Sequence, residues 1–170
     1  LFGLVDPDQG NILIDGKEVD ISHPDDAIKY GIGMVHQHFK LVPSFTIAQN
    51  IMLGSEPSSF GILNTKEEED TVKILADRFG LPVDPNAKIK DIPVGMQQRV
   101  EILKTLQRNA NIIVLDEPTA VLTPQEVDEL FSVVKGLAKK GQTIIFITHK
   151  LVEVMKVADR VSVMRGGKMV

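Results

Sequence analysis

The feature that most constrains the fold is a short apolar run at residues 112–115, which ends in two adjacent carboxylates. The run has four apolar residues, three of them β-branched, with no polar residue between them. This pattern is typical of a strand buried on both faces, as in a parallel sheet covered by helices. Asp116, Glu117 and Pro118 follow directly. Ligands bind at the carboxyl ends of strands in open α/β sheets, so paired acids here suit a metal–phosphate site. The alternative is a buried strand followed by a solvated acidic turn.

A second strand is expected to bring a histidine to the same edge. Residues 123–126 carry a complete helix start, with Thr as cap, Pro first and Glu third. The helix is predicted to end near a glycine after two lysines, and residues 143–147 form the next buried strand. A strand–helix–strand unit of this length forms a right-handed parallel crossover. This geometry places His149 beside Asp116 and Glu117.

Two earlier segments complete the expected sheet region. Residues 10–17 run into Asp-Gly, which predicts an antiparallel hairpin at the edge. Residues 32–35 are predicted to form another short buried strand, followed by His36, Gln37 and His38. The two histidines have no third ligand nearby in sequence, so a metal site there is disfavoured. The Gln37 amide can coordinate Mg²⁺ or orient a water, although the residue taken alone is equally an ordinary loop glutamine.

From about residue 39 to residue 90 the pattern is helical and more polar. Thr46 and Thr65 each begin a capping-box pattern. The acidic run 67–70 is interpreted as a solvated helix face, and residues 57–61 as a mobile connection. We interpret the region as a helical insertion into the sheet domain.

A further helix is expected from about residue 96 to residue 108. Gly95 stands at its start, where a glycine lets a ligand approach the backbone and free N–H groups attract phosphate. An ordinary helix that begins with a glycine explains the pattern equally well if this segment is considered alone.

The remaining segments give weaker predictions. Residues 1–4 resemble the last turn of a helix, and Ser22 is the expected cap of a short helix. Near the end, residues 160–164 are predicted to form a strand that turns back into residues 168–170.

Composition excludes several classes of protein. The 170 residues carry a net charge of −4 with scattered lysines and arginines, so no basic face for nucleic acid is evident. The chain has no cysteine, which excludes disulfides and thiolate metal sites. No apolar run approaches the roughly 18 residues of a membrane span.

Four motifs in this order resemble an ATP-binding cassette (ABC) ATPase: Gln37, residues 95–99, residues 115–119 and His149. Within that family the chain looks most like the first cassette of bacterial importer ATPases for simple sugars or nucleosides. The segments that carry this finer resemblance are residues 33–39, 94–104 and 148–151. The resemblance covers nearly the whole chain.

The resemblance implies an α/β fold: a P-loop NTPase-like, mostly parallel sheet core with an antiparallel β edge and an inserted helical subdomain. Residues 1–38 and 109–170 would form the ATPase core. Residues 39–108 would form the helical subdomain, which ends in the signature helix.

The resemblance also implies roles for four residues. Asp116 would hold Mg²⁺, and Glu117 would act as general base on the attacking water. His149 would contact the γ-phosphate of ATP, and Gln37 would sense the γ-phosphate and Mg²⁺. Catalysis of this kind is mostly positioning and charge stabilisation.

The signature motif departs from the family pattern. In the family it reads Leu-Ser-Gly-Gly-Gln and contacts the nucleotide of a partner cassette. Pro93 cannot supply the serine hydroxyl, and Val94 places a side chain where the backbone should come close. We therefore expect two unequal composite sites. The residues assigned to this contact are Pro93, Val94, Gly95, Met96 and Gln97.

A phosphate-binding Gly-x-x-x-x-Gly-Lys-Ser/Thr loop (Walker A) is absent from the 170 residues, and the resemblance places it just before Leu1. We expect this chain by itself to bind ATP poorly and to hydrolyse essentially none.

The resemblance implies ATP and Mg²⁺ as cofactors and a second cassette, fused or separate, as partner. It also implies permease subunits docked on the helical subdomain, an indirect link to a substrate-binding protein, and a location on the cytoplasmic face of the cell membrane. The alternatives are a soluble ATPase of the same fold and a non-catalytic nucleotide-sensing or scaffold domain.

Overall fold

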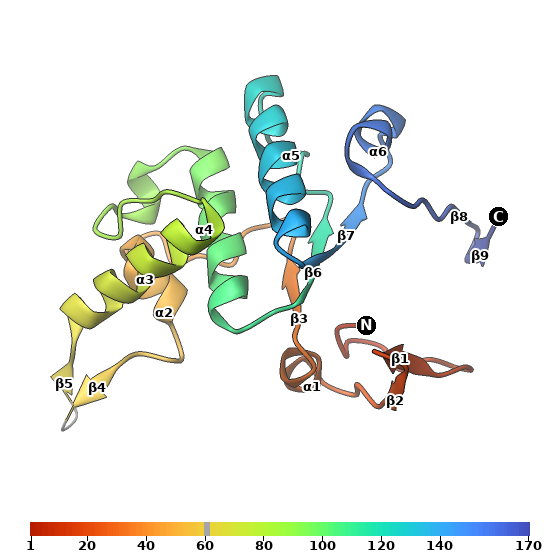
Figure 1. Ribbon diagram of the computed structural model, residues 1–170, viewed down its shortest axis with the longest axis horizontal. Coiled ribbons are helices and arrows are strands. Elements are labelled where there is room, and N and C mark those ends of the chain that lie inside the picture. The colour runs from red at the N-terminus through yellow and green to blue at the C-terminus, as the bar shows by residue number, and fades with distance from the viewer. Residues whose placement is uncertain (60–61) are drawn as a thin grey trace.

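The computed structural model describes residues 1–59 and 62–170, and its centre is a three-stranded parallel sheet in the order β3–β6–β7 (Figure 1). The strands are β3 (Ile32–Val35), β6 (Ile112–Asp116) and β7 (Thr143–Ile147). β6 is the middle strand and pairs with both neighbours in parallel. The predicted α/β class and the parallel crossover from β6 to β7 are confirmed.

Both faces of the middle strand β6 are covered, as its apolar run predicts. On one face, Ile113 and Leu115 join a large cluster formed with helices α4 (Val94–Gln107) and α5 (Pro124–Lys139). On the other face, Val114 packs with residues of helix α1 (Pro24–Lys29) and of the N-terminal hairpin. Alternate side chains of a strand point to opposite faces, so a run without polar residues can fill both sides. The prediction that residues 143–147 are a buried strand was wrong in its burial, because β7 lies at the edge of the sheet and each of its residues is partly or fully exposed.

Helix α4 approaches β3 closely because of a glycine. A Cβ added to Gly33 would lie 2.0 Å from Thr105 Cγ2 and 3.0 Å from Ala110 Cβ. Carbon atoms in contact lie about 3.5–4.0 Å apart, so no larger residue fits without moving the strand or the helix. Gly33 therefore sets the spacing between β3 and α4.

The N-terminal hairpin forms as predicted, with β1 (Ile12–Ile14) and β2 (Lys17–Val19) in antiparallel pairing. Asp15 and Gly16 both have positive φ, as a two-residue type I′ turn requires. The expected cap of α1 was wrong by one residue. His23, not Ser22, is the N-cap, because the backbone N–H of His23 donates to Asp26 and Pro24 occupies the first helical position.

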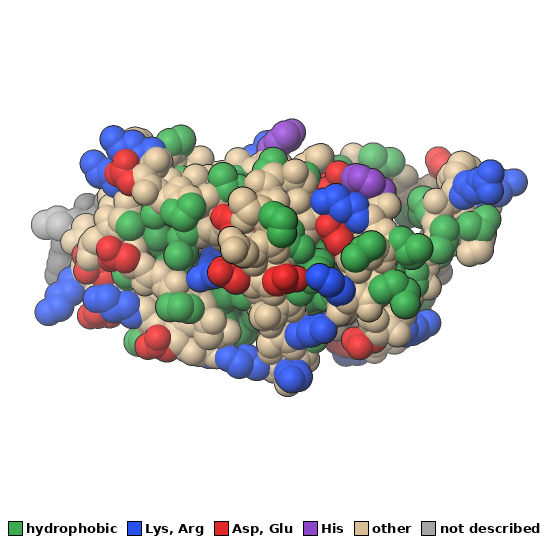
Figure 2. Space-filling model, turned by 90° about the horizontal axis from the view of Figure 1, so that it is seen from above, with side chains coloured by type: hydrophobic (Ala, Val, Ile, Leu, Met, Phe, Trp, Pro, Cys, Tyr) green, Lys and Arg blue, Asp and Glu red, His purple; other side chains and the backbone are tan. Residues whose placement is uncertain are grey.

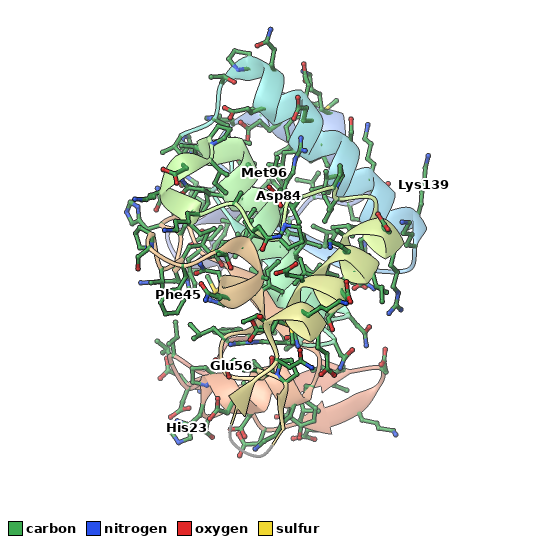
Figure 3. All side chains as sticks on the ribbon, turned by 90° about the vertical axis from the view of Figure 1, so that its left-hand side faces the viewer. His23, Phe45, Glu56, Asp84, Met96 and Lys139 are labelled. Carbon is green, nitrogen blue, oxygen red and sulfur yellow. The ribbon has the colours of Figure 1, made fainter. Side chains whose placement is uncertain are left out.

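The helical segment between β3 and α4 lies to one side of the sheet (Figure 1), and Figure 3 looks at the molecule from that side. It contains α2 (Ile47–Met52), α3 (Thr65–Phe79) and the 3₁₀ turn η1 (Ile89–Asp91), with a short ladder of β4 (Ser58–Ser59) and β5 (Ile62–Leu63) between α2 and α3. Phe60 and Gly61, which end the connection expected at residues 57–61, lie outside the described residues.

One of the two capping boxes in this region is confirmed, and the other is displaced. Thr46 caps α2 reciprocally with Gln49. Helix α3 is instead capped by Asn64, which accepts from the backbone N–H of Glu67, so Thr65 is already the first helical residue. The prediction of a wholly solvated acidic face was also wrong, because Glu68 is only 3% exposed. Burial, with repulsion from Glu56 and Glu69, raises the pKa of Glu68.

One hydrophobic cluster spans the expected boundary between sheet core and helical region. It includes Ile51 of α2 and Val72 of α3, together with Ile113 of β6 and Leu137 of α5. The division into a core (1–38 and 109–170) and a helical subdomain (39–108) stays a prediction.

Of the two predictions at the ends of the chain, the N-terminal one was wrong and the C-terminal one is confirmed only in part. Residues 1–4 form no helix, since a single turn with few partners is too short to be stable. The predicted hairpin at the end of the chain is confirmed in shortened form: its strand begins at Met164 and not at Arg160, and residues 160–163 are exposed and outside it, although the Val163 carbonyl accepts from the backbone N–H of Val170. The C-terminal part contains α6 (Leu151–Val157) and a short hairpin of β8 (Met164–Arg165) and β9 (Lys168–Met169). Among the helices of the described residues, none combines the length and apolar character needed to cross a membrane.

Candidate functional site

The carboxyl end of β6 holds a glutamate in an unusual backbone conformation. Glu117 has φ +43°, a left-handed value that costs energy for a residue with a side chain. Its backbone N–H donates to the carbonyl of Ile147 at 3.0 Å, which ties it to the end of β7. Asp116, the preceding residue, is the last residue of β6 and is half-buried. Strained residues of this kind concentrate at functional sites, where the surrounding structure holds them in place.

The side chains of Gln37 and His149 meet the Glu117 carboxylate from either side. Gln37 Nε2 donates to Glu117 Oε2 at 3.4 Å, and His149 Nδ1 lies 3.1 Å from Glu117 Oε1. Gln37 follows β3 and His149 follows β7, so three neighbouring strand ends supply one group each. When His149 donates through Nδ1–H, its Nε2 is left free as an acceptor.

This group lies on the accessible side of the sheet edge. The His149 side chain is 72% exposed and that of Glu117 is 34% exposed. The strands run upward in Figure 1, so the view from above in Figure 2 looks onto their carboxyl ends. Acidic, basic and histidine side chains lie close together on part of this face. The predicted convergence of Gln37, Glu117 and His149 is therefore present, with Asp116 adjacent along the chain.

These groups have the chemistry for activating a water molecule. A carboxylate at the sheet edge can accept a proton, and the flanking amide and imidazole can orient the water and a nearby oxyanion. Asp116 and Gln37 carry hard oxygen donors, which Mg²⁺ prefers, and Mg²⁺ usually takes its other ligands from water and phosphates. Within the described part of the chain, no cluster of three or more metal-ligating side chains occurs. Two protein oxygens are consistent with a Mg²⁺ held largely by a nucleotide.

The segment 93–97 forms the start of α4 and is held by other contacts. Pro93 is the N-cap, and the backbone N–H of Gly95 donates to Glu126 Oε1 at 3.0 Å. Gln97 Nε2 donates to the carbonyls of Ile89 and Ile92. Met96 is half-buried and labelled in Figure 3. Among the described residues, no hydrogen bond joins this segment to Gln37, Glu117 or His149.

The Glu126 side chain accepts hydrogen bonds at the starts of two helices, α5 and α4. It completes the capping box of α5 with Thr123, and it accepts from Gly95 at the start of α4. Hydrogen bonds from the backbone and side chain of Thr123 and from the Gly95 backbone lower the pKa of Glu126. Its carboxylate therefore stays ionised and occupies an N–H group that a helix start offers to anions.

Two buried polar residues of α4 support the site and were not identified from the sequence. Gln98, 2% exposed, donates through Nε2 to the carbonyl of Pro118 at 2.8 Å. Glu101 accepts from the backbone N–H of Lys40 at 2.6 Å, beyond the segment that bears Gln37. Polar residues in a helix ordinarily face solvent. Nothing in the local pattern marks these two as buried, and only the packing of α4 reveals them.

A cavity of about 310 Å³ lies elsewhere, between α1, β3 and α4. Its walls include Ile28, Ile32, Lys104 and Thr105, and none of the four predicted catalytic or metal residues lines it. The candidate site is thus an open edge of the sheet and not part of this cavity.

Comparison with known proteins agrees with this architecture. Residues 1–120 match the family described as ABC transporter. The chain is 52% identical over 168 residues to the nucleoside import ATP-binding protein NupA of Lactococcus lactis subsp. cremoris, and 55% identical over 168 residues to the guanosine import ATP-binding protein NupO of Bacillus subtilis. Each alignment covers 99% of this chain and 33% of the relative. A crystal structure of a nucleotide-free ATP-binding cassette from an ABC transporter superposes with a TM-score of 0.84 at 23% identity, covering 99% of this chain and 71% of that one.

The chain belongs to the ABC transporter family, and its fold is that of an ABC ATP-binding cassette. It spans about a third of the length of the two relatives named above.

Proposed function

We propose that this chain is part of the ATP-hydrolysing subunit of an importer for a nucleoside or a simple sugar. The observation that carries the proposal is the Glu117 carboxylate, held between Gln37 and His149 at the carboxyl ends of adjacent parallel strands. The two relatives described above bear names of nucleoside and guanosine importers, which supports the nucleoside class in particular.

In this proposal, Glu117 takes a proton from the attacking water, and His149 orients that water and contacts the γ-phosphate of ATP. Gln37 donates to Glu117 and also senses the γ-phosphate, which links hydrolysis to the segment that follows β3. Asp116 and Gln37 would hold Mg²⁺, whose charge offsets the charge on the phosphate oxygens. The side chains therefore contribute chiefly positioning and general-base catalysis.

The signature segment would face the nucleotide bound by a second cassette, through Pro93, Val94, Gly95, Met96 and Gln97. Pro93 lacks a hydroxyl, and the Gly95 N–H is already engaged by Glu126. Both features weaken an anion contact at this helix start. We infer two unequal composite sites, of which Glu117 serves the active one.

The remaining parts of the proposal concern the protein partners of the subunit and its location in the cell. Residues 39–108 would form the helical subdomain on which transmembrane permease subunits dock, and a substrate-binding protein would act indirectly through the permease. The subunit would lie on the cytoplasmic face of the cell membrane and would bind no nucleic acid. Acidic and basic side chains are interspersed on the face shown in Figure 2, which supports this last point.

The test is ATP hydrolysis by the full-length protein assembled with its permease, comparing wild type with Glu117→Gln. Loss of a general base costs about 10²–10⁴-fold in turnover. We expect a fall in kcat of this size with ATP affinity nearly unchanged, because Glu117→Gln keeps the shape of the side chain. Asp128→Asn is the matched control. It removes an exposed carboxylate of α5 that pairs with Lys156 and should leave kcat as in wild type.

Three results would contradict the proposal in different ways. Near-normal turnover in Glu117→Gln would exclude the general-base role. ATP binding without any hydrolysis by the wild type would favour the nucleotide-sensing domain. Full hydrolysis with no co-purifying polytopic membrane protein would favour a soluble ATPase.

A further inference from the structure

A buried carboxylate joins the two loops that carry Glu117 and His149. Glu153 lies in α6 and is only 6% exposed. Its Oε1 accepts a hydrogen bond from Thr119 Oγ1 at 2.7 Å, and its Oε2 accepts one from Thr148 Oγ1 at 2.8 Å. Each oxygen of one carboxylate is therefore bound to a different loop.

The charge of Glu153 is stabilised where it lies. Lys150 Nζ is 3.1 Å from Glu153 Oε1 and 3.2 Å from Thr119 Oγ1. Burial by itself raises the pKa of Glu153, but hydrogen bonds from Thr119, Thr148 and Lys150 outweigh it, so the pKa lies below its usual value. An ionised acceptor makes shorter and stronger hydrogen bonds than a neutral one, so this connection is stiff.

The two threonines whose hydroxyl groups bind Glu153 lie close in sequence to residues of the site. Thr148 directly precedes His149, and Thr119 is two residues beyond Glu117. The register of β6 with β7 ends at the pair of Asp116 and Ile147, so both loops lie beyond the regular ladder. Beyond the ladder the loops are joined both by the 3.1 Å contact of His149 with Glu117 and by the Glu153 carboxylate.

We propose that Glu153 is a positioning residue for ATP hydrolysis, which acts through Thr119 and Thr148 to hold Glu117 and His149 at the separation that water activation requires. The inference rests on the function proposed above. In this proposal Glu153 acts only through its hydrogen bonds to the two threonines. A misplacement of about 1 Å can cost about 10²-fold in rate, so loss of this connection should lower kcat and leave the KM for ATP little changed.

The experiment uses the full-length protein assembled with its permease and measures kcat, the KM for ATP, and the binding of a fluorescent ATP analogue. Four variants are compared with wild type: Glu153→Gln, Thr148→Val, Thr148→Ser and Asp128→Asn. Glu153→Gln and Thr148→Val should lower kcat by about 10- to 100-fold, with KM and nucleotide affinity within about twofold of wild type. Thr148→Ser keeps the hydroxyl and should retain most of the turnover.

Asp128→Asn is the control for simple loss of α6 docking. It removes the exposed 3.1 Å ion pair of Asp128 in α5 with Lys156 in α6, and neither residue is a hydrogen-bond partner of Glu153, Thr119 or Thr148. Its kcat should match wild type. If Glu153→Gln does not fold, the pair Thr148→Val and Thr148→Ser gives the same test, because neither introduces a buried charge.

The outcomes separate this inference from the proposed function. An inactive wild type contradicts both. An active wild type that Glu117→Gln inactivates, with normal kcat in Glu153→Gln and Thr148→Val, overturns the positioning role alone. An equal loss of kcat in Asp128→Asn, or a raised KM with unchanged kcat, also overturns it.

Discussion

Replacing Gly33 by alanine is the sharpest test of how the sheet is packed. The new Cβ would lie 2.0 Å from Thr105 Cγ2, and contact between carbons requires about 3.5–4.0 Å, so the strand or the helix must move by roughly 1.5 Å. Thr105 cannot turn away easily, because β-branched side chains are stiff and its hydroxyl donates to the carbonyl of Glu101 at 2.8 Å. Overpacking of a core costs about 1–3 kcal/mol, and we expect about 3 kcal/mol for Gly33→Ala.

A second substitution should relieve much of this cost. Thr105→Ser removes the clashing methyl and keeps the hydroxyl, and by itself loses about 1 kcal/mol of buried methyl packing. In the double variant the alanine methyl occupies the space that the threonine methyl leaves. We therefore expect a total of about 2 kcal/mol, which is a favourable coupling of about 2 kcal/mol in the double-mutant cycle.

The assay is urea unfolding of the purified chain, followed by far-UV circular dichroism, for wild type, both single variants and the double variant. Gly136→Ala is the matched control. Its Cβ would meet no atom within 4 Å in α5, so it should be neutral or stabilise by up to about 1 kcal/mol. A Gly33→Ala variant within about 0.5 kcal/mol of wild type, or additive costs in the double variant, would refute the close approach of β3 and α4.

The remaining predictions concern pH and nucleotide binding. Burial, together with Glu56 and Glu69, raises the pKa of Glu68 in the folded state, so the folded chain binds this proton more tightly than the unfolded chain. Its contribution to stability is complete below the unfolded pKa near 4.5 and is lost as pH rises through the folded pKa. Glu68→Gln should therefore raise the urea midpoint at pH 7 and have little effect near pH 4; an equal effect at both pH values would contradict this. For nucleotide, isothermal titration of the 170-residue chain should show weak or no ATP binding, because the chain contains no glycine-rich phosphate loop. Micromolar binding would show that the described site suffices.

Much of the fold follows from local patterns in the sequence. The run in β6, the Asp-Gly turn at residues 15–16 and the capping box at Thr123 each depend on a few neighbouring residues. These patterns act through backbone geometry and burial over a few residues, which explains why their predictions are confirmed. Caps were displaced by one residue at α1 and α3, where His23 and Asn64 compete with an adjacent Ser or Thr for the same role.

The predictions that were wrong depend on partners from distant parts of the chain. Residues 160–162 have a strand-like pattern, but the terminal hairpin pairs only Met164 and Arg165 and extends to Val163 by one backbone hydrogen bond, so residues 160–162 belong to no ladder of the described strands. Glu68 lies in an acidic run that looks solvated, yet helix packing buries its side chain.

The sequence by itself determined the class of fold, the strand ends that bear Gln37, Glu117 and His149, and the order of the motifs. The side-chain periods of strands and the direction of a parallel crossover are enough to bring Glu117 and His149 to one edge, whereas the place of Gln37 followed from the family resemblance. Only the tertiary structure decided how that edge is held. The bond of Gln98 to Pro118 and the bridge of Glu153 between Thr119 and Thr148 join residues 5 to 34 positions apart. Such contacts form because buried polar groups must find partners in the folded core, and a local sequence pattern does not specify those partners.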